Sequence, residues 1–277
     1  MRSAVSLNEV SSVRPFIFES FGVNIRIESN RQEMLDDAEQ VVRKSLLNWI
    51  SPLEDITTGH TFTLLEDHGN YLMFRNQEEI ASGESKEIFF KFFDSMIRIV
   101  VAEYAVDRVF LHAGVVGWRG KAIVLPANSF EGKSTLVAEL VRHGAVYYSD
   151  DYAIFDENGF VHPFPRPLTF RTQGINIKPY EISLESIGGV RGELPLRVGF
   201  VLLTGYRPRA KWDPKVLSPG QGVLEMIPFT ISLNHKPDFS LNVLNKISNR
   251  ATIAASYRGT AEKFAKTILD FVDKRVG

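Results

Sequence analysis

The stretch from residue 127 to residue 135 has the residue types and spacing of a phosphate-binding loop. It reads A-x-x-x-x-G-K-S-T and differs from the pattern G-x-x-x-x-G-K-[ST] only at its first position. In such a loop, backbone amides bind phosphate at a helix N-terminus, where the helix dipole favours negative charge. Lys133 could then reach the outer phosphates, and Ser134 could bind a magnesium ion. The residues expected to bind the ligand are Asn128, Ser129, Phe130, Glu131, Gly132, Lys133, Ser134 and Thr135.

The residues on either side of this stretch have the patterns of a strand and a helix. Residues 121–126 form a short apolar run, which indicates a strand. Gly144 supplies a stop signal for a helix that follows the loop. The apolar residues at helical spacing in that helix are Leu136, Val137, Leu140 and Val141. Ala127 stands where the pattern has a glycine, so an ordinary strand-to-helix turn is the alternative interpretation.

Two adjacent carboxylates, Asp150 and Asp151, follow a second strand-like run at residues 145–149. Beside a phosphate-binding loop, one carboxylate can hold magnesium and the other can accept the proton of an attacking hydroxyl. Neighbouring residues of an extended chain point to opposite sides, so we expect the two to have different tasks. The alternative interpretation is a solvated turn.

His112 lies in another apolar run, residues 110–116, which precedes the loop in the chain. This run, a turn at residues 118–120 and the run at 121–126 together predict a β-hairpin that leads into the loop. A single histidine inside an apolar run is more often a buried core residue than a catalytic one.

The order of these features resembles HPr kinase/phosphorylase and its kinase-like relatives, a fold shared distantly with phosphoenolpyruvate carboxykinase. The resemblance rests on His-x-Gly-Val at residues 112–115, the loop, a single helix and then Asp-Asp. It is specific over residues 111–151 and weaker up to residue 171. The chain departs from the family at Ala127 and at residues 181–192, which match poorly the segment rich in arginine and glycine that follows the nucleotide core in true HPr kinases.

The resemblance implies a set of cofactors and residue roles. ATP and Mg²⁺ would be bound by Lys133 and Ser134, with Asp150 as a further metal ligand. Asp151 would be the catalytic base, although the two carboxylates could exchange these roles. His112 would lie near the phosphates.

Two arginines follow the carboxylates in a proline-rich segment at residues 163–171. The prolines stiffen this segment as extended chain. Arg166 and Arg171 could each bind phosphate oxygens with two donors, and kinase-like relatives contain a similar segment. We expect at least one of them in the active site; the alternative is two exposed arginines on a loop.

Composition limits the classes of partner. The chain has 277 residues, a net charge of −1 and no cysteine, which excludes disulfides and thiolate chemistry. The balance of charges gives no argument for a nucleic-acid partner or an anionic membrane. No apolar run approaches the roughly 20 residues of a membrane span, and the polar N-terminus lacks the apolar centre of a signal peptide. We therefore expect a cytoplasmic protein and leave open whether it forms a homo-oligomer.

Residues 1–107 are expected to form a small α+β module without catalytic residues. Its phenylalanine-rich helix should pack this module against the core formed by residues 108–277, with Phe89, Phe92 and Phe93 mostly buried. The expected elements are a strand at 18–27, a helix at 30–49, a hairpin of 61–65 and 71–74, and a helix at 85–105.

Residues 108–277 are expected to form an α/β nucleotide-binding core of the HPr kinase/phosphoenolpyruvate carboxykinase type. After the carboxylates, the sequence predicts a hairpin of residues 153–155 and 160–162 around an Asn-Gly turn, and a central strand at 196–203. The tail predicts a short helix, a strand at 256–258 and a final amphipathic helix.

Two functions fit this sequence. The first is an ATP-dependent kinase that transfers the γ-phosphate to a hydroxyl of a small molecule, peptide or protein. The second is a nucleotide-binding regulatory module with little turnover, which Ala127 favours and which the intact Lys133, Asp150 and Asp151 oppose. A phosphorylase or a hydrolytic NTPase is a minor alternative.

Overall fold

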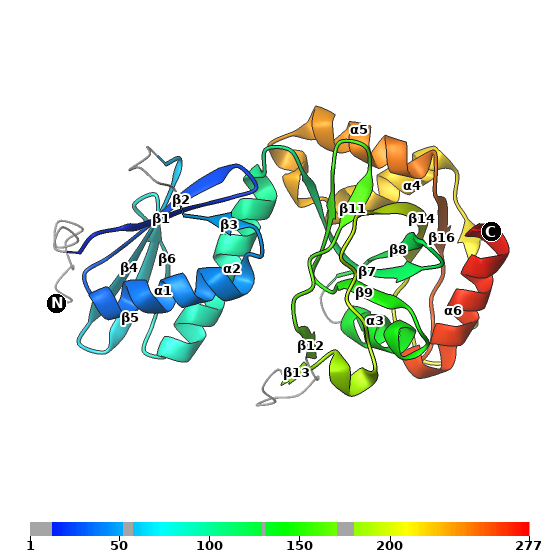
Figure 1. Cartoon of the computed structure of the whole chain (residues 1–277), viewed down its shortest axis with the longest axis horizontal. Coiled ribbons are helices and arrows are strands. Elements are labelled where there is room, and N and C mark those ends of the chain that lie inside the picture. The colour runs from blue at the N-terminus through cyan, green and yellow to red at the C-terminus, as the bar shows by residue number, and fades with distance from the viewer. Residues whose placement is uncertain (1–12, 52–57, 129–130, 171–179, 277) are drawn as a thin grey trace. The chain divides into compact units, whose positions relative to one another are not determined.

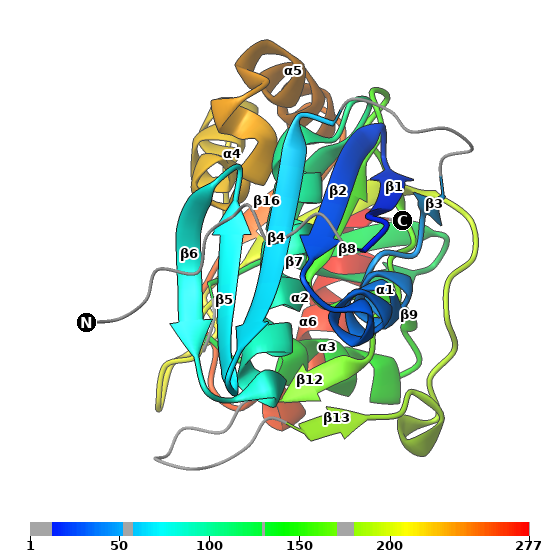
Figure 2. The ribbon, with the colours of Figure 1, turned by 90° about the vertical axis from the view of Figure 1, so that its left-hand side faces the viewer.

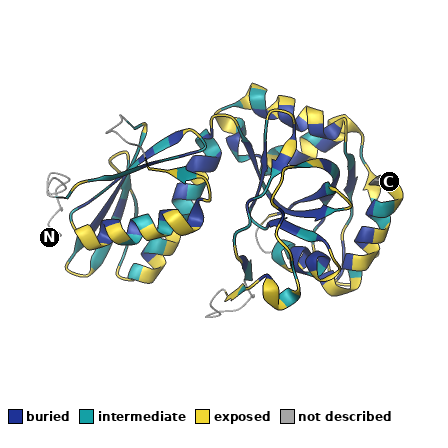
Figure 3. Cartoon of the chain, in the orientation of Figure 1, coloured by how far each residue is buried: buried dark blue, intermediate teal, exposed yellow. Residues whose placement is uncertain are grey.

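The structure, a computed structural model, describes residues 13–51, 58–128, 131–170 and 180–276. The chain divides into two compact units, Met1–Asp107 and Arg108–Gly277. Both combine sheets with helices (Figure 1), and in both the central strands are buried while the helices expose one side (Figure 3). Within the described ranges, no helix has the length and apolar character needed to cross a membrane.

The N-terminal unit contains a mixed sheet with the strand order β3-β1-β2-β4-β5-β6, seen in Figure 2. Its strands are β1 (Phe16–Ser20), β2 (Val23–Ser29), β3 (Trp49–Ile50), β4 (His60–Asp67), β5 (Asn70–Arg75) and β6 (Glu78–Gly83). β2 and β4 are parallel and are connected through α1 (Gln32–Ser45), whereas the other neighbours are antiparallel.

Two expectations for this unit were wrong in their boundaries. Residues 18–27 form a hairpin instead of one strand, because Phe21 and Gly22 take positive φ angles of 51° and 77° and reverse the chain. The apolar alternation continues through this turn and hides it in the sequence. The helix expected over 30–49 ends at Ser45, and Trp49 belongs to β3.

The phenylalanine-rich helix α2 (Lys86–Tyr104) packs on the sheet of its own unit. It begins after Ser85, whose hydroxyl accepts a hydrogen bond from the amide of Ile88. Phe89 and Phe93 are buried and contact Tyr71 and Phe62, with ring centroids 5.5 and 5.7 Å apart. Phe92 is 38% exposed, so the expectation that all three phenylalanines are buried was wrong for this residue.

The C-terminal unit is built on a larger sheet with the strand order β11-β10-β7-β8-β14-β16-β15, and β9 also pairs with β7. β8, β14 and β16 are parallel neighbours, and β7 is antiparallel to β8. The strands are β7 (Val109–Trp118), β8 (Lys121–Pro126), β9 (Val146–Ser149), β10 (Tyr152–Phe155), β11 (Phe160–His162), β14 (Leu196–Leu203), β15 (Lys215–Val216) and β16 (Thr252–Ala255). A separate small sheet pairs β12 (Leu168–Phe170) with β13 (Tyr180–Ile182).

Helices cover both faces of this sheet and create two cores (Figure 1). On one face lie α3 (Lys133–Arg142) and α6 (Ala261–Val276), and on the other lie α4 (Pro219–Met226) and α5 (Pro237–Ser248). Because side chains alternate along a strand, Leu125 joins the first core and its neighbour Val124 joins the second. The strand expected at 256–258 lies earlier, at β16, and within 256–258 Arg258 forms an isolated parallel bridge with Tyr206.

Candidate functional site

The segment between β8 and α3 begins in the core and ends at a glycine in the left-handed conformation. Ala127, directly after β8, is buried. Gly132 precedes α3 with φ 74° and ψ 29°, a conformation that residues with a side chain rarely adopt. The glycine of Gly-Lys-Ser is therefore required by the backbone. Ser129 and Phe130, expected in the ligand-binding set, lie outside the described residues.

Ala127 fits the loop without backbone strain. It is absent from the residues with positive φ, so the conformation that would demand a glycine does not occur there. Asn128, the next residue, donates its backbone amide to Oε2 of Glu131 over 2.8 Å. A loop amide thus binds a carboxylate, as a loop that binds an anionic ligand must be able to do.

Lys133 and His112 contact each other across the space between α3 and β7. The Lys133 Nζ and His112 Nε2 atoms are 2.7 Å apart, and because an ammonium only donates hydrogen bonds, Nε2 must be the acceptor. Gly114 allows this approach, since a Cβ there would lie 2.5 Å from Cγ2 of Val137 on α3. The glycine of His-x-Gly therefore brings the helix close enough for Lys133 to reach β7.

Asp150 and Asp151 lie between β9 and β10, which both pair with β7. They follow the strand-like run expected at residues 145–149, and they interrupt a chain that runs antiparallel to β7 on both sides of them. The backbone amide of Ala113 on β7 donates to the carbonyl of Asp151 over 3.3 Å, and Ala113 is also paired with Pro126 of β8. The carboxylates and the start of the loop are therefore at the same level on opposite sides of β7.

The pKa of the Tyr147 hydroxyl depends on the charged residues around it, including the carboxylate pair. Burial has the largest effect and raises the pKa of this hydroxyl well above its usual value, and the charges of Asp150 and Asp151 raise the pKa further. Arg166 and Arg191 act in the opposite direction, so both arginines lie near the same hydroxyl. The hydroxyl donates to the backbone carbonyl of Arg166 over 2.5 Å. Arg166 is thus near the same tyrosine hydroxyl as the two carboxylates.

Arg191 was not among the predicted site residues, because residues 181–192 were interpreted only as a poor family match. Arg171 lies outside the described residues. Thr135, the last residue expected in the ligand-binding set, is exposed on the first turn of α3.

Arg258 is the residue that sequence reasoning missed most clearly. Its side chain is 2% exposed, and Nη2 donates to the backbone carbonyls of Gly132 over 2.7 Å and of Glu131 over 3.3 Å. Burial lowers the pKa of its guanidinium to about 10, which leaves it cationic at neutral pH. The C=O and N–H of a trans peptide point in opposite directions, so the amides of Gly132 and Lys133 point away from Arg258. Arg258 therefore fixes two loop peptides so that their amides point to the side opposite its guanidinium.

The donors available for magnesium are hard oxygen atoms, as this ion prefers. Ser134 lies in the first turn of α3, and Asp150 is half-buried with its Oδ1 atom shielded from solvent. Magnesium usually binds one or two carboxylates together with substrate phosphates and water. In the ranges that the structure describes, no group of three or more His, Asp and Glu residues could hold a metal ion. Ser134 and Asp150 fit magnesium as partners of a bound phosphate.

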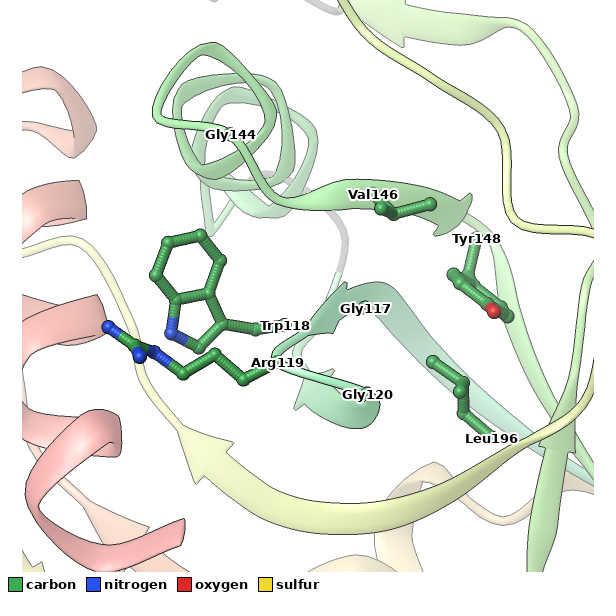
Figure 4. A pocket seen from close by; sticks show the side chains of 8 residues that line it. All are labelled: Gly117, Trp118, Arg119, Gly120, Gly144, Val146, Tyr148 and Leu196. Carbon is green, nitrogen blue, oxygen red and sulfur yellow. The ribbon is translucent and has the colours of Figure 1, made fainter. Parts of the chain in front are cut away.

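A cavity of about 330 Å³ lies at the other end of β7, away from His112. Figure 4 shows its walls, which are Gly117, Trp118, Arg119, Gly120, Gly144, Val146, Tyr148 and Leu196. Arg119 extends toward α6 and forms an ion pair there with Asp273. The Asp273 carboxylate also accepts a hydrogen bond from Trp118 Nε1. None of the residues expected in the functional site lines this cavity.

The fold thus brings His112 and Lys133 into contact, and it places Asp150, Asp151 and Arg166 on the other side of the same strand. These residues come from four separate segments of the C-terminal unit. His112 lies on β7, Lys133 contacts His112, and the strands on either side of the two carboxylates pair with β7. No protein-family model matches the chain, and no curated protein matches it at a significant level.

Proposed function

We propose that the C-terminal unit is an ATP-dependent kinase that transfers the γ-phosphate to a hydroxyl of a small molecule, peptide or protein. The observation that carries this proposal is the position of β7 between two groups of charged residues. Lys133, at the start of α3, contacts His112 on this strand, and the two carboxylates interrupt the neighbouring strand. The resemblance to HPr kinase/phosphorylase over the same residues agrees with the proposal.

In the proposed reaction, positioning and charge neutralisation do most of the work. The acceptor oxygen forms a bond to the γ-phosphorus, the bond to the bridging oxygen breaks, and ADP leaves. Lys133 neutralises phosphate charge after exchanging His112 for a phosphate oxygen. Asp151 accepts the proton of the acceptor hydroxyl, and Arg166 stabilises the transferred group. Magnesium, held by Ser134 and Asp150, would supply further positive charge at the phosphates.

The direct test is phosphate transfer from γ-labelled ATP to a panel of sugars, amino alcohols and hydroxyl-bearing peptides. The wild-type protein is compared with Asp151→Asn and with Asp270→Asn, a control on the exposed face of α6. We expect transfer to one class of acceptor in the wild type and in the control, and its loss in Asp151→Asn. Equal transfer by all three proteins would contradict the assigned base.

The alternative is a regulatory module that binds ATP and turns it over little. The bond between the Asn128 amide and Glu131 favours this alternative, because a carboxylate of the protein already occupies one loop amide. The carboxylate pair argues against it, since nucleotide binding alone requires only one of the two. Mixing stoichiometric protein and ATP separates the two functions: a module retains ATP, whereas a kinase produces ADP when an acceptor is added.

A further inference from the structure

The loops after β14 and β16 meet the candidate phosphate loop at one edge of the sheet. β8, β14 and β16 are parallel neighbours (Figure 1), so their carboxyl ends lie at the same edge. The backbone amide of Arg258 donates to the carbonyl of Gly205 over 3.1 Å, and the amide of Arg207 donates to the carbonyl of Arg258 over 2.9 Å. The Arg258 guanidinium then binds the carbonyl of Gly132. The three loops are therefore fixed to one another by a single buried residue.

Two tyrosines and an arginine are exposed on these two loops. Tyr206 is 49% exposed and Tyr257 is 59% exposed. The guanidinium carbon of Arg207 lies 5.4 Å from the ring centroid of Tyr257. Tyr206 is next to the phosphate loop, because its Cβ would lie 3.9 Å from a Cβ placed on Gly132. Aromatic faces and a guanidinium plane are thus available to a ligand directly beside the loop.

We propose that Tyr206, Arg207 and Tyr257 bind the base of the nucleotide whose phosphates occupy the loop. This inference rests on the proposed function. The carboxylates that would face the transferred phosphate lie on the β7 side of β8, whereas these three residues follow β14 and β16 on the opposite side. A nucleotide bound with its γ-phosphate toward the carboxylates therefore has its base on the tyrosine side. Bases stack on tyrosine rings and on arginine planes, largely without regard to base identity.

The test compares the affinities of ATP and of inorganic tripolyphosphate, each with magnesium, for the full-length protein by calorimetry. Tripolyphosphate carries the phosphates and lacks the base. We expect Tyr257→Ala and Tyr206→Ala to weaken ATP binding roughly 5- to 100-fold, the range that loss of one base stack produces. Tripolyphosphate affinity should stay unchanged, Tyr257→Phe should restore ATP affinity, and Phe92→Ala, an exposed aromatic of the N-terminal unit, should change neither.

Each other outcome has a defined meaning. Unchanged ATP affinity in both alanine variants would overturn the proposal, and so would equal losses for ATP and tripolyphosphate, which would indicate a distorted loop. If the wild type binds tripolyphosphate as tightly as ATP, the result supports the phosphate site and contradicts the base site. If the wild type binds neither compound, the proposed function itself fails and the base site with it.

Discussion

The two ends of β7 use the same device for different purposes. Toward the loop end, Gly114 in the middle of the strand lets α3 approach, which brings Lys133 to His112. At the other end a Cβ on Gly117 would lie 2.9 Å from the Tyr148 ring and 3.1 Å from Leu196, and here the space between elements stays open as a cavity. A glycine on a strand therefore allows either close packing or an open pocket, depending on what lies opposite.

The two ends also differ in how the charge of an arginine is compensated. At the cavity end, Arg119 is paired with Asp273. At the loop end, the described hydrogen-bond acceptors of the buried Arg258 guanidinium are backbone carbonyls, which carry no full negative charge. Burying a cation costs free energy unless an anion compensates it. The loop end, rather than the cavity end, is therefore where an anionic ligand would be stabilised.

The largest effect is expected for the carboxylates. Asp151→Asn should keep ATP binding and lower phosphate transfer roughly 10²- to 10⁴-fold, the usual contribution of a general base. Asp273→Asn, at the cavity end, should leave transfer at the wild-type rate. Steady-state transfer assays on the two variants measure this contrast, which would disappear if both carboxylates were only structural.

Arg258→Met should produce the next largest effect. It removes charge-assisted hydrogen bonds to the carbonyls of Gly132, Glu131 and Gly259, and we expect roughly 2–4 kcal/mol lower free energy of unfolding. ATP affinity should fall as well, because the loop amides lose their fixed orientation. Arg258→Lys should not restore it, since a lysine lacks the planar fork. Urea unfolding and calorimetry measure the two effects separately, and wild-type ATP affinity in Arg258→Met would contradict this role.

Glu131→Gln should change affinity less and in the opposite direction. The Glu131 carboxylate accepts the Asn128 amide and repels a phosphate that competes for it. Removing one negative charge at a partly exposed position should raise ATP affinity about two- to fivefold, and less at high salt. A titration at two salt concentrations measures this. Weaker binding in the variant would mean that Glu131 holds the loop in its binding conformation.

Ala127→Gly should have the smallest effect. Ala127 does not adopt a positive φ, so glycine gains no required conformation there. We expect ATP affinity to be equal or slightly better and the free energy of unfolding to fall by about 0.5–1 kcal/mol through chain entropy. If glycine abolished binding, the conformation described for this loop would be wrong.

The sequence predicted the elements whose signals are local. The β7–β8 hairpin, β14 and α3 follow from continuous apolar runs and helical spacing, and all three are confirmed. The contact between Lys133 and His112 was not itself predicted, although the resemblance places both residues near the phosphates. Arg258 could not, because it contacts Gly132 across 126 positions of the chain, and no spacing rule connects residues that distant.

The boundaries that failed have a common cause. In residues 18–27 the apolar alternation runs through the turn at Gly22, and near the C-terminus the strand expected at 256–258 lies earlier in the chain, at β16. Alternation reports which side chains face a core, and it does not report where backbone pairing stops. Backbone angles and hydrogen bonds supply that information.

The central claim is that the loop before α3 binds magnesium-ATP through Lys133. Calorimetric titration of ATP with magnesium into the wild type, Lys133→Ala and Lys121→Ala tests it most directly, since Lys121 begins β8 beside the cavity. We predict that Lys133→Ala lowers ATP affinity at least about tenfold, the loss expected for one charge-assisted contact, and that Lys121→Ala binds as the wild type does. Wild-type affinity in Lys133→Ala would contradict the claim.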